Sequence, residues 1–326
     1  MGRMIYVPQY PAPMRYSEFH FIEFEKEFQK HFSDIIVLGK KYIEKMNEPF
    51  AIKYGHHFSP MNHAITFEQI QIEEYLNLKL REDDILYLND ISFPGLFANV
   101  LYHKKPKYCY AYCHGTSQNN YDYFSNNRKS KWNVETGHSQ LFEIVFVATS
   151  YHSRKLGWDN TCIVALPKAP DKYIANQFPL KKETLILSTN RPTIQKYTKK
   201  IEDRIEKKYG KIKRIQCSTW EDYSLELSSA LMMLSTTKEE TFGYTILDAI
   251  TCGCVPLVPN NLCFPELLPP DYLYNSYDDL TSKIDMVLNR KLQCPSKLLN
   301  HSMIDNFYNN ICGSMKNTSG YYNGGI

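Results

Sequence analysis

The sequence lacks a large excess of charge of either sign, and it lacks long apolar runs. Its 326 residues carry 38 lysines and arginines against 35 aspartates and glutamates, a formal net charge of +3. So small a charge does not indicate a nucleic-acid-binding surface, although it leaves a nucleic-acid partner open. No apolar run approaches the roughly 20 residues of a membrane-spanning helix. With 43% hydrophobic residues, the chain can bury a large core, enough for about two domains.

The sequence also lacks regular cysteine spacing, although it has nine cysteines. Cys252 and Cys254 are too close together for a zinc site, and the adjacent His56 and His57 cannot both face one ion from a regular element. We therefore expect reduced, mostly buried thiols and no metal site. Pro8 precedes any apolar stretch that could serve as a signal peptide, so a soluble, cytoplasmic protein is expected.

Short apolar runs alternate with longer amphipathic segments, which is typical of parallel sheets covered by helices on both faces. The expected strands span residues 4–7, 34–38, 85–88, 108–113, 144–148, 163–166, 185–189, 214–217, 231–235 and 255–258. The clearest helices are expected at residues 17–31, 67–78, 198–209 and 245–252. No internal repeat is apparent.

A proline-punctuated stretch, with Pro167, Pro170 and Pro179, separates the two series of strands and suits a connector between domains. We predict an α/β protein with two doubly wound, Rossmann-like domains that face a central cleft. The expected divisions are an N-terminal domain at residues 1–168, a linker at 169–182, a C-terminal domain at 183–313 and a flexible tail at 314–326. Open α/β sheets bind ligands at the carboxyl ends of their strands, so functional side chains are expected in the loops that follow strands.

Residues 235–258 are the most informative stretch, because they read as a strand, a loop with an acid and a glycine, a helix ended by Gly253, and another strand. Glu240 and Asp248 are eight residues apart, a little over two helical turns, so they lie near one another in projection. Gly243 allows backbone amides at the helix N-terminus to approach a phosphate closely. A carboxylate at each end of that surface can accept hydrogen bonds from sugar hydroxyls.

This stretch resembles the signature of the retaining, GT-B-fold glycosyltransferases of the glycogen synthase and sucrose synthase-like group, the glycosyl transferases group 1 family. The signature has an acid, any residue, Phe or Tyr, Gly, a second acid eight positions after the first, Ala, a small residue and Gly-x-Pro-Val. The matching residues are Glu240, Thr241, Phe242, Gly243, Asp248, Ala249, Gly253, Cys254 and Pro256. Asp248 replaces the usual Glu and Leu257 replaces Val, but the shorter carboxylate should still reach a ribose.

The resemblance implies that a nucleotide sugar binds to this stretch, through Phe242, Gly243, Tyr244, Thr245 and Asp248. It implies that Glu240 holds the transferred sugar, that amides around Gly243 hold sugar or phosphate, and that Asp248 holds the ribose. Glu239 is a competing acid, but its nine-residue distance from Asp248 fits the signature less well. The alternative is an ordinary surface loop followed by an amphipathic helix.

Basic residues follow the first expected strand of the second domain. The resemblance implies that Arg191 and Lys196, beside Asn190, bind the donor diphosphate. Arg supplies a planar fork and Lys a point charge, which can stabilise a leaving diphosphate without a metal ion. Taken alone, both would be read as solvated surface charges, and Pro192 between them departs from the family pattern.

The first domain offers weaker signals. His114 follows the strand at 108–113, and the resemblance implies a histidine there that touches the donor sugar, although a structural histidine fits as well. Aromatic and basic residues at 119–131 could hold an acceptor, but we favour a solvated turn. The first loop, residues 8–16, has three prolines in place of the family's Gly-rich loop. Asp90 also follows a strand, where we favour an N-cap for the next helix over a position in the cleft.

The resemblance thus implies a retaining glycosyltransferase that moves a hexose from a nucleotide-diphosphate sugar to a hydroxyl acceptor. The family is described with front-face attack, in which the departing phosphate helps to deprotonate the acceptor. The sequence has no Asp-x-Asp metal signature, so we expect no required divalent ion and no cofactor besides the donor.

Glycan or small polar acceptors are ranked ahead of a modified nucleic-acid base. The chain is small for this fold, and it is rich in Asn, Lys, Tyr and Ile, the residues that an A+T-rich genome encodes. Both features are also compatible with a phage or viral enzyme. The alternatives are a nucleotide-sugar epimerase or phosphorylase of the same fold, and a non-catalytic sugar-nucleotide-binding module. Oligomeric state, donor and acceptor identity stay open.

Overall fold

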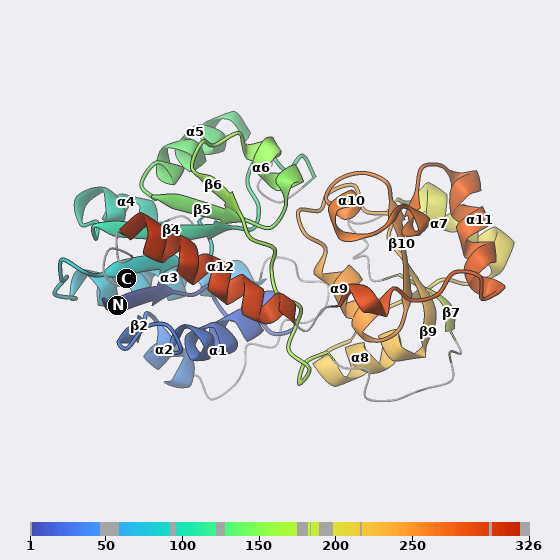
Figure 1. Ribbon diagram of the computed structural model, residues 1–326, viewed down its shortest axis with the longest axis horizontal. Coiled ribbons are helices and arrows are strands. Elements are labelled where there is room, and N and C mark those ends of the chain that lie inside the picture. The colour runs from blue at the N-terminus through green and yellow to red at the C-terminus, as the bar shows by residue number, and fades with distance from the viewer. Residues whose placement is uncertain are drawn as a thin grey trace, which may run out of the picture.

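The protein has two α/β lobes, each with a parallel sheet and flanking helices (Figure 1). The computed structural model describes residues 2–45, 59–91, 96–121, 128–174, 182, 184–188, 198–215, 217–299 and 302–319. The predicted fold class, two doubly wound α/β domains, is confirmed. Within the described residues no helix has the length and apolar character needed to cross a membrane. None of the nine cysteines forms a disulfide, and most of them are buried.

The N-terminal lobe has a six-stranded sheet in the order β2-β1-β3-β4-β5-β6. Its strands are β1 (Met4–Val7), β2 (Ile35–Val37), β3 (Ile85–Leu88), β4 (Tyr108–Cys113), β5 (Ile144–Val147) and β6 (Thr161–Ile163). Its helices are α1 (Tyr16–Phe28), α2 (Lys40–Lys45), α3 (Ser59–Leu76), α4 (Phe97–His103), α5 (Arg128–Ser139) and α6 (Ser150–Leu156). The first strand lies inside the sheet, and the chain winds outward from it in both directions, as in doubly wound folds.

The C-terminal lobe has a five-stranded sheet in the order β11-β10-β9-β7-β8. Its strands are β7 (Thr184–Ser188), β8 (Lys213–Arg214), β9 (Ala230–Leu234), β10 (Val255–Pro259) and β11 (Leu273–Tyr274). The helices after β7 are α7 (Lys199–Tyr209), α8 (Trp220–Ser229), α9 (Tyr244–Thr251), α10 (Phe264–Leu267), α11 (Tyr277–Leu288) and α12 (Ser302–Ser319). The strands predicted at 163–166 and 214–217 are found earlier in the sequence, as β6 and β8, and β11 was not predicted.

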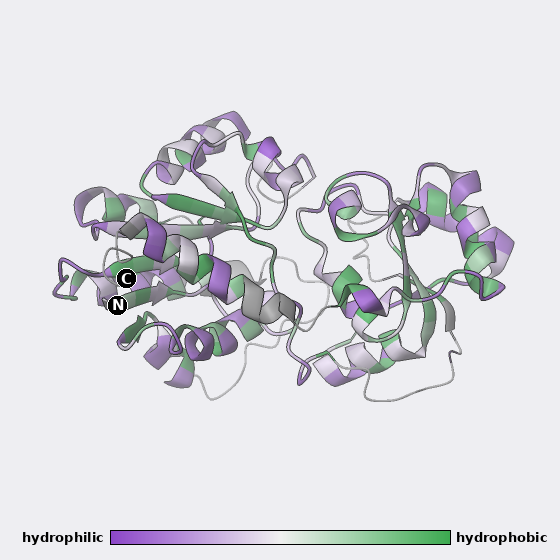
Figure 2. Ribbon diagram, viewed as in Figure 1, coloured by the Kyte–Doolittle hydropathy of each residue, from purple (hydrophilic) through white to green (hydrophobic). Residues whose placement is uncertain are grey.

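The central strands are apolar on both faces because helices cover them on both sides (Figure 2). Every residue of β1 and β3 is buried. The rings of Tyr6 and Tyr87, on these two strands, stack with centroids 5.9 Å apart. At the other end of β1, the Arg3 guanidinium forms a buried ion pair with Asp84, with Nη2 and Oδ2 2.7 Å apart. The core therefore holds β1 and β3 rigidly, and their carboxyl ends are fixed platforms for side chains.

Helix α12 leaves the C-terminal lobe and packs across the N-terminal lobe (Figure 1). Its buried residues are Phe307, Tyr308, Ile311, Cys312 and Met315. The Tyr110 hydroxyl of β4 donates to the carbonyl oxygen of Met315 at 3.1 Å. The expectation of a flexible tail from residue 314 is therefore wrong over 314–319, and residues 307–315 pack with the N-terminal lobe. The Asn, Ser and Gly content of the segment concealed its helical apolar spacing.

Candidate functional site

The loop between β9 and α9 turns sharply into its helix at Gly243. This residue has φ +91°, in the left-handed region, and a Cβ there would lie 3.3 Å from both Ile246 Cγ1 and Phe264 Cε1. Glycine is needed because other residues adopt this conformation only with strain. The first N–H groups of a helix have no partners within it, so the turn presents the N-terminus of α9 as a place for an anion.

Thr241 joins this loop to the N-terminal lobe. Its hydroxyl donates to the carbonyl oxygen of His114 at 2.9 Å, and its own carbonyl accepts from the Thr149 hydroxyl at 2.9 Å. His114 follows β4 and Thr149 follows β5, so the loop of one lobe lies against the carboxyl ends of two strands of the other. The signature residues are thus found at the boundary between the lobes, where the sequence predicted a binding site.

The two adjacent acids of the loop have different surroundings. Glu239 is buried and forms an ion pair with Lys155 of α6, with Oε1 and Nζ 2.5 Å apart. Glu240 is half-buried and its Oε1 accepts the Thr241 amide at 3.2 Å. Glu239 therefore joins the two lobes, whereas Glu240 keeps part of its surface in contact with solvent. The choice of Glu240 as the site residue stays a prediction.

Two further contacts join the lobes, and no sequence pattern predicts either of them. Glu266 of α10 accepts the backbone N–H groups of Ser150 at 2.7 Å and Tyr151 at 2.6 Å. A carboxylate at this position accepts hydrogen bonds from N–H groups in the first turn of α6, which have no partner within the helix, and the helix dipole favours its negative charge. The Trp220 indole of α8 donates to Glu18 of α1 at 2.7 Å. These pairs are remote in sequence, so only the tertiary structure brings them together.

Tyr244, the first residue of α9, meets an aromatic and histidine cluster from the N-terminal lobe. Its hydroxyl is 2.7 Å from His20 Nε2, and its ring stacks on Tyr16 with centroids 5.5 Å apart. His20 Nδ1 is 3.3 Å from the side-chain nitrogen of Asn89. Burial holds the pKa of His20 well below its usual value, so the imidazole is neutral. Sequence reasoning missed His20 because it lies within an ordinary amphipathic helix.

His114 lies at the carboxyl end of β4, as expected. Its Nε2 is 2.9 Å from the carbonyl oxygen of Asn89, and a carbonyl only accepts, so Nε2 carries the proton and Nδ1 is an acceptor. The rings of Tyr16 and Tyr112 have their centroids 4.8 Å from that of His114. Burial lowers the pKa of His114 to about 3, which makes it a neutral hydrogen-bonding group and a poor proton donor or acceptor at neutral pH.

Asp248 lies on the inner face of α9 and is 6% exposed. The Tyr223 hydroxyl of α8 donates to its Oδ2 at 3.2 Å. Burial raises the pKa of Asp248 to about 7, and the hydrogen bond from Tyr223 opposes that shift. Phe242 is 3% exposed and packs in the core between the lobes, so it offers a ligand only its backbone. A ribose contact at Asp248 stays a prediction.

The predicted diphosphate-binding residues Asn190, Arg191 and Lys196 lie outside the described residues. The strand that leads to them, β7, ends at Ser188. Their role stays a prediction. In the part of the chain that the structure describes, no three His, Cys, Asp or Glu side chains come together in a way that could hold a metal ion.

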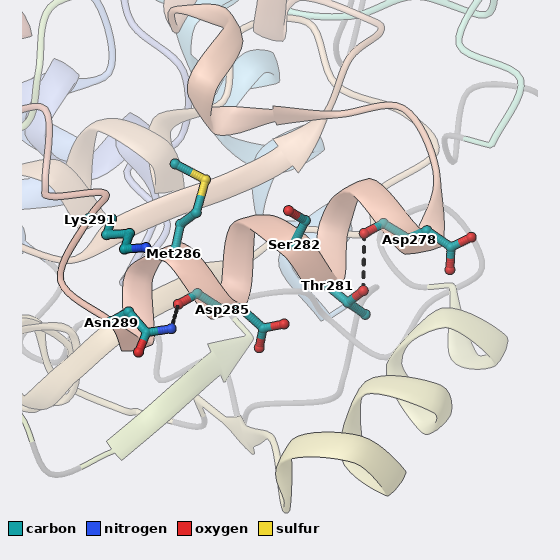
Figure 3. Close-up of a pocket in the computed structure, with 7 residues that line it drawn as sticks. All are labelled: Asp278, Thr281, Ser282, Asp285, Met286, Asn289 and Lys291. Carbon is teal, nitrogen blue, oxygen red and sulfur yellow. Dashed lines mark hydrogen bonds between the residues drawn. The ribbon is translucent and has the colours of Figure 1, made fainter.

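A hollow on the outer face of α11 is not part of this site (Figure 3). The Thr281 hydroxyl donates to the carbonyl of Asp278 at 3.0 Å, and the Asn289 amide donates to that of Asp285 at 2.8 Å. The Thr281 and Asn289 side chains thus bond within their own helix.

No protein-family model matches the sequence. A tRNA-queuosine alpha-mannosyltransferase of Drosophila melanogaster is 41% identical over 64 residues, which is 20% of this chain and 17% of that protein. The match therefore spans about a sixth of that relative's length.

Three solved structures are similar over nearly the whole chain. Sucrose-phosphate synthase from Thermosynechococcus elongatus superimposes with a TM-score of 0.65 at 11% identity, covering 98% of this chain and 99% of that one. A lipopolysaccharide outer core galactosyltransferase gives 0.61 at 13% identity, with coverages of 98% and 99%. Trehalose-6-phosphate synthase gives 0.58 at 11% identity, with 98% of each chain covered. The resemblance predicted from the signature is thus confirmed at the level of the fold: the chain has the GT-B fold of glycosyltransferases.

Proposed function

We propose that the protein is a retaining glycosyltransferase that moves a hexose from a nucleotide-diphosphate sugar to a hydroxyl acceptor. The observation that carries the proposal is the contact between Thr241 and His114, 2.9 Å long, which brings the signature loop of one lobe against the strand ends of the other. In this arrangement the carboxylate of Glu240, the N-terminus of α9 and the imidazole of His114 belong to one region at the boundary between the lobes.

In this proposal Glu240 accepts hydrogen bonds from the transferred sugar, and the amides after Gly243 face sugar or phosphate. Asp248 accepts from the ribose, and Arg191 with Lys196 neutralises the charge that develops on the leaving diphosphate. Such preorganised charges stabilise the transition state without a general base on the protein. No divalent ion is needed in this scheme.

His114 has a limited role in this scheme. Because its pKa is lowered to about 3, it is neutral at physiological pH and does not act as a general acid. Its Nδ1 can accept a hydrogen bond from a sugar hydroxyl while Nε2 stays bonded to the backbone of Asn89. We therefore assign to it the orientation of the donor sugar.

The curated relative supports a choice of substrates. Its name states that it transfers mannose to queuosine in tRNA, and its matched segment is 41% identical to this chain. This favours a mannosyl donor, and it favours a modified nucleoside in RNA over a glycan as the acceptor. A net charge of +3 predicts weak contact with the rest of the nucleic acid.

A thermal-shift panel tests the donor site. UDP, GDP, ADP and their glucose, mannose and N-acetylglucosamine conjugates are added with and without EDTA, since a ligand at 100 times its Kd adds about 2.7 kcal/mol of stability. We expect a shift with one nucleotide family, unaffected by EDTA and lost in Lys196→Ala. An unchanged melting temperature with every nucleotide would contradict the proposal.

The products formed from the sugar nucleotide distinguish a transferase from the alternative functions. An epimerase or phosphorylase would convert the sugar nucleotide without an acceptor hydroxyl, and a binding module would bind it without conversion. A transferase forms a glycoside only when an acceptor is present, apart from slow hydrolysis, and mass spectrometry of the products distinguishes the three.

A further inference from the structure

Positive charge is concentrated in helix α7 and the segment that directly follows it. Residues 199–214 hold eight lysines and arginines against three aspartates and glutamates, a net charge of +5, although the whole chain has only +3. The rest of the chain is therefore slightly acidic. A net charge taken over the whole chain conceals such a segment, whereas the local charge determines where a polyanion binds.

The outer side of α7 carries a line of cations. Lys200, Arg204 and Lys207 are exposed, and their spacing of four and three residues places them on one face of the helix. They extend over about 10 Å at a rise of about 1.5 Å per residue. Lys199 and Lys211 flank the line and are exposed as well. We call Lys200, Arg204 and Lys207 the basic face.

The charge of the basic face is not neutralised within the part of the chain that the structure describes. Ion pairs in this segment form at its other cations, which are Lys208 with Asp285, Lys213 with Glu226, and Arg214 with Glu202. No described carboxylate forms an ion pair with Lys200, Arg204 or Lys207. The face therefore keeps an excess of positive charge, even though Asp203 is exposed on the same helix.

Arg204 is held in place by Tyr277 of α11. Its guanidinium carbon lies 3.5 Å from the centre of the Tyr277 ring, and the Tyr277 hydroxyl donates to the carbonyl oxygen of Arg204 at 3.1 Å. Stacking covers the flat side of a guanidinium and leaves the N–H groups at its edge for other partners. A planar fork of N–H groups suits the oxygens of a phosphate.

The N-terminal end of α7 contacts the signature loop. Thr198 is the N-cap residue of α7. Its amide donates to the Thr236 hydroxyl at 3.1 Å, and its hydroxyl donates to the Thr236 carbonyl at 2.7 Å. Thr236 lies in the loop between β9 and α9, which carries Glu240. The basic face thus begins next to the candidate site and continues away from it along the helix.

A polymer with repeated phosphates fits the basic face better than a small anion or a bilayer. Cations spread over about 10 Å of an exposed helix cannot all contact one small anion. A helix that lies in a bilayer surface presents large apolar side chains beside its cations. All of α7 is described, and none of its large apolar side chains is exposed, since Ile205 is fully buried and packs in the core.

We propose that the basic face of α7 binds the phosphate backbone of the RNA that carries the acceptor nucleoside. The identification of this partner rests on the proposed function, in which a modified nucleoside in RNA is the favoured acceptor. The nucleoside occupies the boundary between the lobes at the signature loop, and the strand that continues from it passes along α7. Contacts of this kind position a nucleic acid without reading its sequence.

The triple variant K200Q/R204Q/K207Q tests the proposal, because it removes the charge of the basic face and keeps side chains of good helix propensity. The variant K200R/K207R retains all three charges. We expect K200R/K207R to bind RNA as the wild type does, which shows that a loss in the triple variant comes from charge. Circular dichroism checks that both variants keep the fold.

The matched control is R290Q/K291Q/K297Q. It also removes one arginine and two lysines, from exposed positions between α11 and α12. The control and the triple variant therefore have the same net charge, so any difference between them depends on where the charges lie.

The probe is a short fluorescein-labelled RNA hairpin, whose Kd is measured by fluorescence polarisation over a series of KCl concentrations. We expect K200Q/R204Q/K207Q to raise the Kd at least tenfold at low salt. The slope of log K against log salt should become shallower by about 2–3, because each phosphate contact contributes about 0.7–0.9 to it. The control should keep the wild-type slope. An equal loss in the control, or wild-type binding by the triple variant, would overturn the inference.

Vesicles of equal parts phosphatidylserine and phosphatidylcholine test the membrane as the other extended anion. We expect no flotation of the wild type with these vesicles. If the vesicles bind the wild type but not K200Q/R204Q/K207Q, while the RNA binds both alike, the basic face is a membrane-binding surface and the inference is wrong.

The thermal shift with sugar nucleotides reports separately on the proposed function. Equal shifts for the wild type and K200Q/R204Q/K207Q show that the donor site is intact, so a loss of RNA binding belongs to α7. If RNA binds through α7 but no sugar nucleotide shifts the melting temperature, the RNA-binding surface stands and the transferase assignment fails. If a sugar nucleotide binds but the RNA does not bind the wild type, the inference fails and the transferase assignment stands.

Discussion

At the residue scale, the site combines groups that the sequence identifies with groups that only the fold brings near them. Glu240 and Gly243 follow from the signature spacing, and Gly243 has the left-handed conformation that only glycine adopts without strain. His20 and Glu266 carry no local signal, because a histidine or a glutamate in a helix is ordinary until its partner in the other lobe is known. Sequence spacing therefore predicts the motif, and tertiary contacts determine its surroundings.

Asp248→Asn should remove a pH dependence of stability. Burial raises the pKa of Asp248 from its usual 3.8 to about 7 in the folded state. The folded state therefore binds more protons, and its stability falls as the pH rises from about 4 to about 7. The full effect is of the order of 4 kcal/mol at about 1.4 kcal/mol per pKa unit. Urea unfolding of wild type and variant at pH 4.5 and 7.5 should show the variant gaining relative stability at the higher pH. The control Asp203→Asn, at an exposed position, should show the same pH dependence of stability as the wild type. If Asp248→Asn also shows the pH dependence of the wild type, the raised pKa of Asp248 is contradicted.

Glu240→Gln and Glu239→Gln should separate catalysis from the contact between the lobes. We expect Glu240→Gln to lower kcat by at least a hundredfold, or roughly 2.7 kcal/mol, while the melting temperature is unchanged. Glu239→Gln breaks the charge pairing with Lys155 and should lower stability more than Glu240→Gln does. Kinetics with the donor found in the thermal-shift panel, together with calorimetry, check both. Full activity of Glu240→Gln would remove it from the site.

At the scale of elements, strands with continuous apolar runs were predicted closely, and elements with weak patterns were not. The observed β1, β3 and β4 have the predicted bounds, because each is buried on both faces and reads as an unbroken apolar run. The structure gives β8 only two residues, too few for any periodicity. Helix α12 was missed because its apolar positions are spaced among Asn, Ser and Gly.

Gly243→Ala should distort the start of α9. A Cβ would be strained at φ +91° and would lie 3.3 Å from two side-chain atoms, which together should cost about 1–3 kcal/mol of stability and weaken nucleotide binding. Gly137→Ala is the control, because Gly137 is in helix α5 with no atom within 4 Å of its Cβ position, and there alanine should be neutral or stabilising. Denaturant unfolding and nucleotide titration measure both effects, and wild-type behaviour of Gly243→Ala would contradict the strained turn.

At the scale of the whole molecule, several of the contacts that join the two lobes involve the signature loop and its helix. The loop bonds to strand ends of the N-terminal lobe through Thr241, and the ring of Tyr244 stacks on Tyr16. The arrangement as two α/β domains was predictable from the alternation of strands and helices. The pairing of side chains across the boundary was not, because it depends on how the lobes meet.

Phe307→Ala should destabilise the N-terminal lobe, although residue 307 follows the entire C-terminal sheet in sequence. Its ring is 1% exposed and packs on Phe24 with centroids 5.2 Å apart. Removing a buried phenylalanine typically costs about 3–5 kcal/mol. Hydrogen exchange should show faster opening in β1 and β4, whereas Asn309→Ala on the exposed face of α12 should leave them protected. Faster exchange confined to the C-terminal sheet would contradict the packing of α12 on the first lobe.

The return of α12 also has a consequence for synthesis. A ribosome completes the six strands of the first sheet long before it reaches residues 307–315, whose side chains close the aromatic core around Phe24 and Phe28. During that interval the nascent first lobe exposes an apolar surface, which is a substrate for chaperones and a risk for aggregation. The N-terminal lobe is thus translated first, but its core is complete only after residues 307–315 have been synthesised.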